Sequence, residues 1–135
     1  MIQKLFAKNG FTLVELLLVV IILAALAAMI MPRLAGRSEK AKIAITKTDV
    51  TSNIPLALDL YELDNGRYPD NLQALLTDPG GLENWNGPYI KREPLDPWGK
   101  EYGYKYPPSS DKDYDLYSFG PDGVESNDDI TNWKK

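Results

Sequence analysis

The run GFTLVELLLVVIILAALAAMIM, residues 10–31, is the long apolar segment around which the rest of the chain is organised. From Phe11 to Met31 it contains one charged residue, Glu15. A helix of this length rises roughly 30 Å at about 1.5 Å per residue, which matches the thickness of a bilayer's hydrocarbon core. We therefore predict a membrane-spanning helix. An acid inside such a helix is costly unless it finds a partner, so Glu15 is the first candidate functional residue.

The composition excludes several kinds of chemistry. The chain has 135 residues, which leaves about 100 for one small domain once this apolar stretch and the residues before it are set aside. It contains no Cys and no His. Disulfides, thiolate chemistry, Cys-ligated zinc and Ser–His catalysis are therefore excluded, and we expect a protein that is not an enzyme.

Charge is divided unevenly along the chain. Residues 1–47 hold seven Lys or Arg and two Glu, whereas residues 48–135 hold eight Lys or Arg and 17 Asp or Glu. An acidic C-terminal part argues against nucleic-acid binding. Residues 111–129 alone contain seven acids and one Lys, which is typical of a solvated loop or a cation site.

A second helical pattern follows the apolar stretch, from Leu34 to about Tyr61. Its apolar residues recur at helical spacing, namely Ile43, Val50, Ile54, Ala57 and Tyr61. Pro55 lies inside this pattern, and an interior proline kinks or breaks a helix. We expect the kink or break near Thr51–Asn53.

Short elements are predicted for the rest of the chain. Gly66 suits a left-handed helix end, and Asp70 with Gln73 has the spacing of a capping box for a short helix. Residues 79–99 have the composition of a loop whose aromatics pack onto the core. Alternation around Tyr104 and over residues 113–119 predicts an antiparallel pair of strands.

The run from Gly10 to Glu15 resembles the class III signal of type IV pilins and pseudopilins. The resemblance implies cleavage by a prepilin peptidase between Gly10 and Phe11, N-methylation of Phe11, and an assembly role for Glu15. It also implies that Pro32 weakens the helix. The basic residues that follow the apolar stretch would place the C-terminal part in the cytoplasm, whereas the motif places it on the other side of the membrane. We give the motif more weight because it is more specific.

Five runs in the soluble part narrow the resemblance. They are LYELDNGRYP (60–69), WNGPY (85–89), DPWG (96–99), YSFGPDG (117–123) and DDITNW (128–133). In this order they are similar to the major pseudopilins of type II secretion, the general secretion pathway protein G family. The absence of Cys agrees, because many type IV pilins carry a C-terminal disulfide loop.

The resemblance implies an α+β, pilin-like fold, in which a long N-terminal helix packs on a small antiparallel sheet with a C-terminal cation-binding loop. It divides the chain into a leader (1–10), a transmembrane and assembly helix (11–32) and a periplasmic domain (33–135). The protein would be a single-pass protein of the bacterial inner membrane that polymerises into a pseudopilus and drives export of folded proteins. Its partners would be further copies, minor pseudopilins, an inner-membrane assembly platform and the prepilin peptidase.

One calcium ion is predicted in the acidic C-terminal loop. Gly123 permits a tight turn, and the returning acids can meet Asp122 across a short loop. The resemblance implies side-chain ligands Asp122, Asp128 and Asp129, with backbone carbonyls near Phe119 and Ser126. An EF-hand starting at Asp111 is rejected because its sixth position is Leu116 instead of Gly.

Three other functions remain open at this point. The chain could be a type IV pilin of a surface fibre, a membrane-anchored binding module that uses its acidic loop and aromatics, or a membrane-tethered enzyme that relies on carboxylate pairs. The last is disfavoured because nothing in the sequence positions such a pair.

Overall fold

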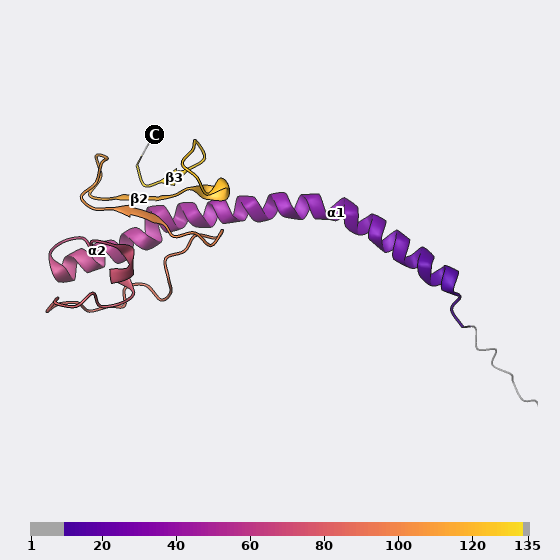
Figure 1. The fold of residues 1–135 in the computed structure, drawn as a ribbon, viewed down its shortest axis with the longest axis horizontal. Helices are drawn as coiled ribbons and strands as arrows, with labels where there is room; N and C mark the ends of the chain where they lie inside the picture. The colour runs from indigo at the N-terminus through magenta and orange to yellow at the C-terminus, as the bar shows by residue number, and fades with distance from the viewer. Residues whose placement is uncertain (1–9, 134–135) are drawn as a thin grey trace, which may run out of the picture. The chain divides into compact units, whose positions relative to one another are not determined.

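The computed structural model describes residues 10–133, without the side chains of residues 32–35. Most of the predicted leader, residues 1–9, therefore lies outside the described residues. The elements are α1 (Leu13–Thr48), a π-helical turn (Asp49–Asn53), α2 (Ile54–Asn65), 3-10 turns at Leu72–Leu75 and Gly120–Asp122, and strands β1 (Gly103–Lys105), β2 (Asp115–Ser118) and β3 (Ile130–Thr131) (Figure 1). The chain forms two compact units, one ending at Ser38 and the other beginning at Glu39.

Helical backbone runs without a break from Leu13 to Asn65. It continues through Pro32, so this proline does not end the helix. The break expected near Thr51–Asn53 is also absent. The departure from regular geometry there is the π-helical turn, whose last hydrogen bond runs from the Ile54 N–H to the Asp49 carbonyl.

The π-helical turn explains how Pro55 is accommodated. Pro55 is the second residue of α2, which begins at Ile54. A proline has no N–H and interrupts the regular hydrogen-bond ladder of a helix, and the π-helical turn precedes it, with the Ile54 N–H bonded five residues back to the Asp49 carbonyl. The wider turn thus lies directly before α2, and regular helix resumes with Pro55 near its start.

The end of α2 agrees with the prediction, but the predicted capping box is wrong. Gly66 has φ 78° and its N–H donates to the Glu62 carbonyl at 2.7 Å. The cap of the following 3-10 turn is Asn71, whose Oδ1 accepts from the Ala74 N–H at 3.1 Å. The Asp70 carboxylate instead pairs with Arg67 at 3.0 Å, which removes it from the backbone.

The sheet has three antiparallel strands in the order β1-β2-β3. The predicted pair is confirmed as β1 and β2, with Tyr104 opposite Leu116. The two-residue strand β3 was not predicted, and it places Ile130 opposite Ser118. In Figure 1 the strands lie alongside the end of the long helix that belongs to the second unit.

The core of the second unit lies between helix and sheet. The predicted helix positions Val50, Ile54, Ala57 and Tyr61 are buried, and Ile43 packs against them from a partly buried position. From β2 and the residue before it come Leu116 and Tyr114. The loop aromatics pack against this cluster as predicted; they are Trp85, Tyr89 and Trp98.

Candidate functional site

The processing motif lies at the start of α1. Gly10 and Phe11 precede the helix and are exposed. The Thr12 hydroxyl accepts from the Glu15 N–H at 3.2 Å, which is an N-cap bond to the third helical residue. Glu15 is therefore in the first turn, where the helix dipole favours a negative charge. The sequence already contained this signal, because Thr followed three residues later by Glu is the spacing of a capping box.

The apolar part of α1 buries none of its membrane-length window within the described chain. Its large side chains, such as Leu17 and Ile22, are at least 45% exposed. The window is long and apolar enough to cross a membrane.

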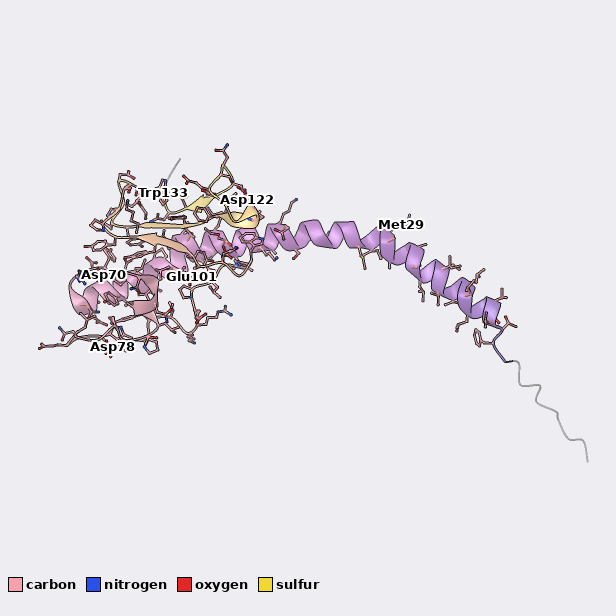
Figure 2. All side chains as sticks on the ribbon, in the orientation of Figure 1. Met29, Asp70, Asp78, Glu101, Asp122 and Trp133 are labelled. Carbon is pink, nitrogen blue, oxygen red and sulfur yellow. The ribbon has the colours of Figure 1, made fainter. Side chains whose placement is uncertain are left out.

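The predicted calcium residues converge on one serine of the acidic loop. Asp122, at the end of the sheet in Figure 2, accepts through Oδ2 from the Ser126 hydroxyl at 3.0 Å. The same hydroxyl also contacts Asp128 Oδ1. The Ser126 N–H donates to Asp129 Oδ1 at 3.0 Å. The structure therefore brings all three predicted carboxylates together.

The donor chemistry of this loop fits calcium, because calcium is bound by carboxylate and carbonyl oxygens. Gly123 takes the left-handed conformation expected of a tight turn, with φ 68°. Among residues 10–133, however, no three acidic side chains are placed as a ready metal site. The carboxylates of Asp122 and Asp128 instead share the single hydroxyl of Ser126, and Asp129 accepts from the Ser126 N–H. The side-chain role of Ser126 was not predicted.

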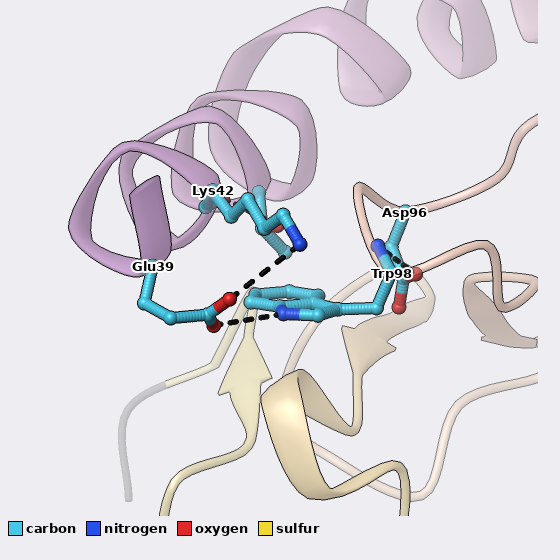
Figure 3. Close-up of polar contacts among 5 residues, drawn as sticks. Glu39, Lys42, Asp96 and Trp98 are labelled. Carbon is cyan, nitrogen blue, oxygen red and sulfur yellow. Dashed lines mark hydrogen bonds and ion pairs between the residues drawn. The ribbon is translucent and has the colours of Figure 1, made fainter. Parts of the chain in front are cut away.

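A second polar cluster, which was not predicted, begins at Glu39, the first residue of the folded unit. Figure 3 shows the Trp98 indole N–H donating to Glu39 Oε2, at 3.0 Å. The other oxygen of Glu39 pairs with Lys42 at 3.5 Å. Trp98 is held by the buried Asp96, whose Oδ1 accepts from the Trp98 and Lys100 N–H groups. The loop at residues 96–99 is therefore tied to the helix where the folded unit begins.

Two more acids, the buried Asp115 and the partly buried Asp49, act as structural acceptors. Asp115 accepts from the N–H of Ser109 at 2.7 Å and from that of Ser110 at 3.2 Å. Burial by itself raises the pKa of Asp115, but the hydrogen bonds from Ser110 and Ser109 outweigh it and leave the pKa below its ordinary value. The Tyr102 hydroxyl donates to Asp49 at 2.8 Å. Burial and then this bond raise the pKa of Tyr102, so the phenol remains a donor.

Comparison with known families gives two matches that together span most of the chain. The family model of type II secretion system protein G matches residues 33–133. The model of the prokaryotic N-terminal methylation motif matches residues 5–31.

Individual proteins are similar over nearly the full length. The chain is 44% identical to type II secretion system core protein G of Pseudomonas aeruginosa, over 93% of this chain and 95% of that protein. Its identity to the protein of the same description from Vibrio cholerae is 42%, over 97% and 95% of the two chains. The crystal structure of the major pseudopilin from the type 2 secretion system of enterohaemorrhagic Escherichia coli matches with TM-score 0.61 and 38% identity, over 73% of this chain and 87% of that one.

Proposed function

The chain belongs to the type II secretion system protein G family and is a structural subunit of the type II secretion pseudopilus, and from this premise we propose how its two units serve that role. The first unit anchors the subunit in the inner membrane before assembly and forms the filament core afterwards. The second unit, facing the periplasm, forms the outer body of the pseudopilus that moves folded proteins toward the outer membrane. The observation that carries this proposal is the apolar window of α1, which the chain itself leaves uncovered.

Maturation would proceed by cleavage between Gly10 and Phe11 and methylation of the new amine. The match to the N-terminal methylation motif over residues 5–31 supports this step. Both residues lie outside the helix and are exposed, as a peptidase requires of its substrate backbone. Cleavage leaves a positive amine at Phe11, four residues before Glu15 and at the same end of the apolar helix.

Glu15 would pair with the Phe11 amine of a neighbouring copy during assembly. Its place in the first helical turn keeps the carboxylate at the end of α1, where incoming amines would also lie. Within the described part of the first unit, no Lys or Arg forms an ion pair with Glu15. A charge brought from a second copy would therefore lower the cost of burying this acid.

The test compares Glu15→Ala with the unchanged chain in cells that carry the complete secretion apparatus. We expect the variant to insert in the membrane and fold, but to lose filament formation and secretion. Gln at the same position, which keeps the size without the charge, should fail in the same way. Normal secretion by either variant would contradict the assembly role.

We also propose that Asp122, Asp128 and Asp129 hold one calcium ion, with carbonyls near Phe119 and Ser126. What supports this is the convergence of three carboxylates on Ser126 in a loop rich in acids. Repulsion among these carboxylates destabilises the loop, and a cation bound only by the folded state would stabilise the domain by mass action.

Melting of the full chain in detergent, with calcium and with a chelator, tests the ion. We expect a higher melting temperature with calcium, and loss of that difference in Asp122→Asn. Asp78→Asn, which changes an exposed acid outside this loop, is the matched control and should keep the full calcium effect. An equal calcium effect in Asp122→Asn would refute the site.

The partners would be further copies of the chain, minor pseudopilins, the inner-membrane platform and the prepilin peptidase. The family is structural, so ATP hydrolysis would belong to a separate component. The family assignment favours the pseudopilin role over the type IV pilin and binding-module alternatives.

A further inference from the structure

The chain contains two Asn-Gly pairs, Asn65–Gly66 and Asn86–Gly87. In such a pair the backbone nitrogen of Gly can attack the side-chain amide carbon of Asn, because Gly has no Cβ to hinder the approach. The attack closes a succinimide ring and releases ammonia. It requires that the Gly nitrogen and the Asn side chain are both free to move, and the two pairs differ in this respect.

The structure holds Asn65–Gly66 in an arrangement that opposes this attack. Asn65 is the last residue of α2, and the Gly66 N–H donates to the Glu62 carbonyl at 2.7 Å. The Asn65 side-chain amide donates to the Tyr61 carbonyl at 3.0 Å, and its oxygen is buried. Attack at Asn65 would therefore break both hydrogen bonds and with them the cap of α2.

Asn86–Gly87 carries none of these restraints. The pair lies in the loop at residues 79–99, and Asn86 is exposed. The hydrogen bond at Asn86 comes from its backbone N–H, which donates to the Tyr89 hydroxyl at 3.0 Å. Within residues 10–133, neither the Asn86 side chain nor the Gly87 N–H forms a hydrogen bond. Both reacting groups are therefore available.

Packing of the loop requires glycine at position 87. A Cβ on Gly87 would come within 2.5 Å of the Trp85 ring. That ring is held in place, because its indole N–H donates to the Ala74 carbonyl at 2.9 Å and its edge packs against Tyr89. A larger residue after Asn86, which would hinder the attack, is thus excluded by the packing of the loop. The fold therefore keeps the residue that makes Asn86 reactive.

We propose that Asn86 is a site of spontaneous deamidation. The Gly87 backbone nitrogen gives up its proton and bonds to Asn86 Cγ. The bond from Cγ to the side-chain nitrogen breaks, and this nitrogen takes the proton and leaves as ammonia. Water then opens the ring at either carbonyl and leaves aspartate or isoaspartate at position 86. The step needs only water, and the inference does not depend on the proposed function.

Isoaspartate at position 86 would disturb the link between this loop and α2. It carries the main chain through the side-chain carbon, which inserts one extra carbon before Gly87. The Asn86 N–H bonds to the Tyr89 hydroxyl, and this hydroxyl donates to Asp64 Oδ2 in α2 at 2.7 Å. A longer main chain moves the N–H away from its acceptor. We therefore expect the modified subunit to melt at a lower temperature than the natural one.

Peptide mapping by mass spectrometry of the full chain, kept folded in detergent at mildly alkaline pH, tests the site. We expect deamidation at Asn86 at least tenfold faster than at Asn65. In denaturant the two rates should become similar, because both residues precede Gly and only the fold distinguishes them. Equal rates in the folded chain, or faster reaction at Asn65, would overturn the proposal. Asn84 is exposed but precedes Trp85, so an equal rate at Asn84 would also overturn it.

Asn86→Gln is the matched variant, because its longer side chain would have to close a larger ring, which forms more slowly. Before incubation it should melt at the temperature of the natural chain, since the exposed side chain it alters forms no hydrogen bond there. After incubation the natural chain should contain a fraction that melts at a lower temperature, and the variant should not. A low-melting fraction of equal size in both chains would show that the damage lies elsewhere and would contradict the proposal.

Discussion

The apolar helix before Ser38 and the folded unit that begins at Glu39 differ in how far they bury leucine side chains. Leu18 in the first is 58% exposed, whereas Leu58 in the second is 0% exposed. The folded unit gains its stability from its own core. The apolar helix leaves its hydrophobic surface to lipid or to other chains. One chain thus joins a self-sufficient domain to a segment that is complete only in a membrane or an assembly.

The largest expected difference between the two regions comes from one substitution made in each. Leu58→Ala opens a cavity in the core and should lower the free energy of unfolding by about 2–5 kcal/mol. Leu18→Ala removes the same atoms from a side chain with no core around it, so the stability of the domain should not change. Thermal melting of the full chain in detergent measures both. Equal losses would show that the apolar helix packs on the domain.

Glycine gives a smaller difference between the regions. A Cβ on Gly103 in β1 would come within 2.2 Å of the Tyr117 ring, whereas one on Gly36 in α1 would meet nothing within 4 Å. Gly103→Ala should therefore displace the ring and cost about 1–3 kcal/mol. Gly36→Ala should stabilise the helix by roughly 0.5–1 kcal/mol, because Gly is a poor helix former.

Denaturant unfolding of the domain and backbone amide exchange of the helix measure these two effects. A Gly103→Ala variant as stable as the natural chain would mean that the Tyr117 ring is free to move away.

The smallest expected effect is the loss of stability at low pH, and it concerns the folded unit alone. Because the pKa of Asp115 is lowered on folding, its carboxylate contributes stability at neutral pH. That contribution is lost as the pH falls below about 4, through the lowered pKa of the folded state. Asp115→Asn should reduce the difference in melting temperature between pH 6 and pH 3. Asp111→Asn, at an exposed position nearby, should leave that difference unchanged.

Features set by neighbouring residues were predictable from the sequence. The apolar stretch, the end of α2 at Gly66 and the pairing of β1 with β2 all depend on local composition and period. The helix face was also correct, and the helix departs from regular geometry where Pro55 was expected to kink or break it, although the departure is a π-helical turn and not a break. A π-helical turn before it preserves the helix, and nothing in the residue types distinguishes such a turn from a break.

Features set by distant contacts were missed. Glu39 and Trp98 are 59 residues apart in the sequence, and neither residue type predicts that it will bond to the other. Asp96 and Asp115 are charged residues that the fold buries among N–H donors, contrary to the usual preference of acids for solvent. Asp70 was preferred over Asn71 as a cap because the pattern could not show that Arg67 takes the Asp70 carboxylate. The sequence analysis grouped Asp122, Asp128 and Asp129 with the backbone of Ser126, but it did not predict that the Ser126 hydroxyl contacts two of these carboxylates.

Maturation of the first unit at Gly10, on which its use in assembly depends, can be followed by intact-mass spectrometry of the membrane-extracted chain. In cells with an active prepilin peptidase, we predict the mass of a chain that starts at Phe11 and carries one methyl group. Gly10→Val should retain the mass of the precursor from Met1, because the bulkier residue blocks the cleavage site. A natural chain that keeps its Met1 start in the same cells would contradict the account.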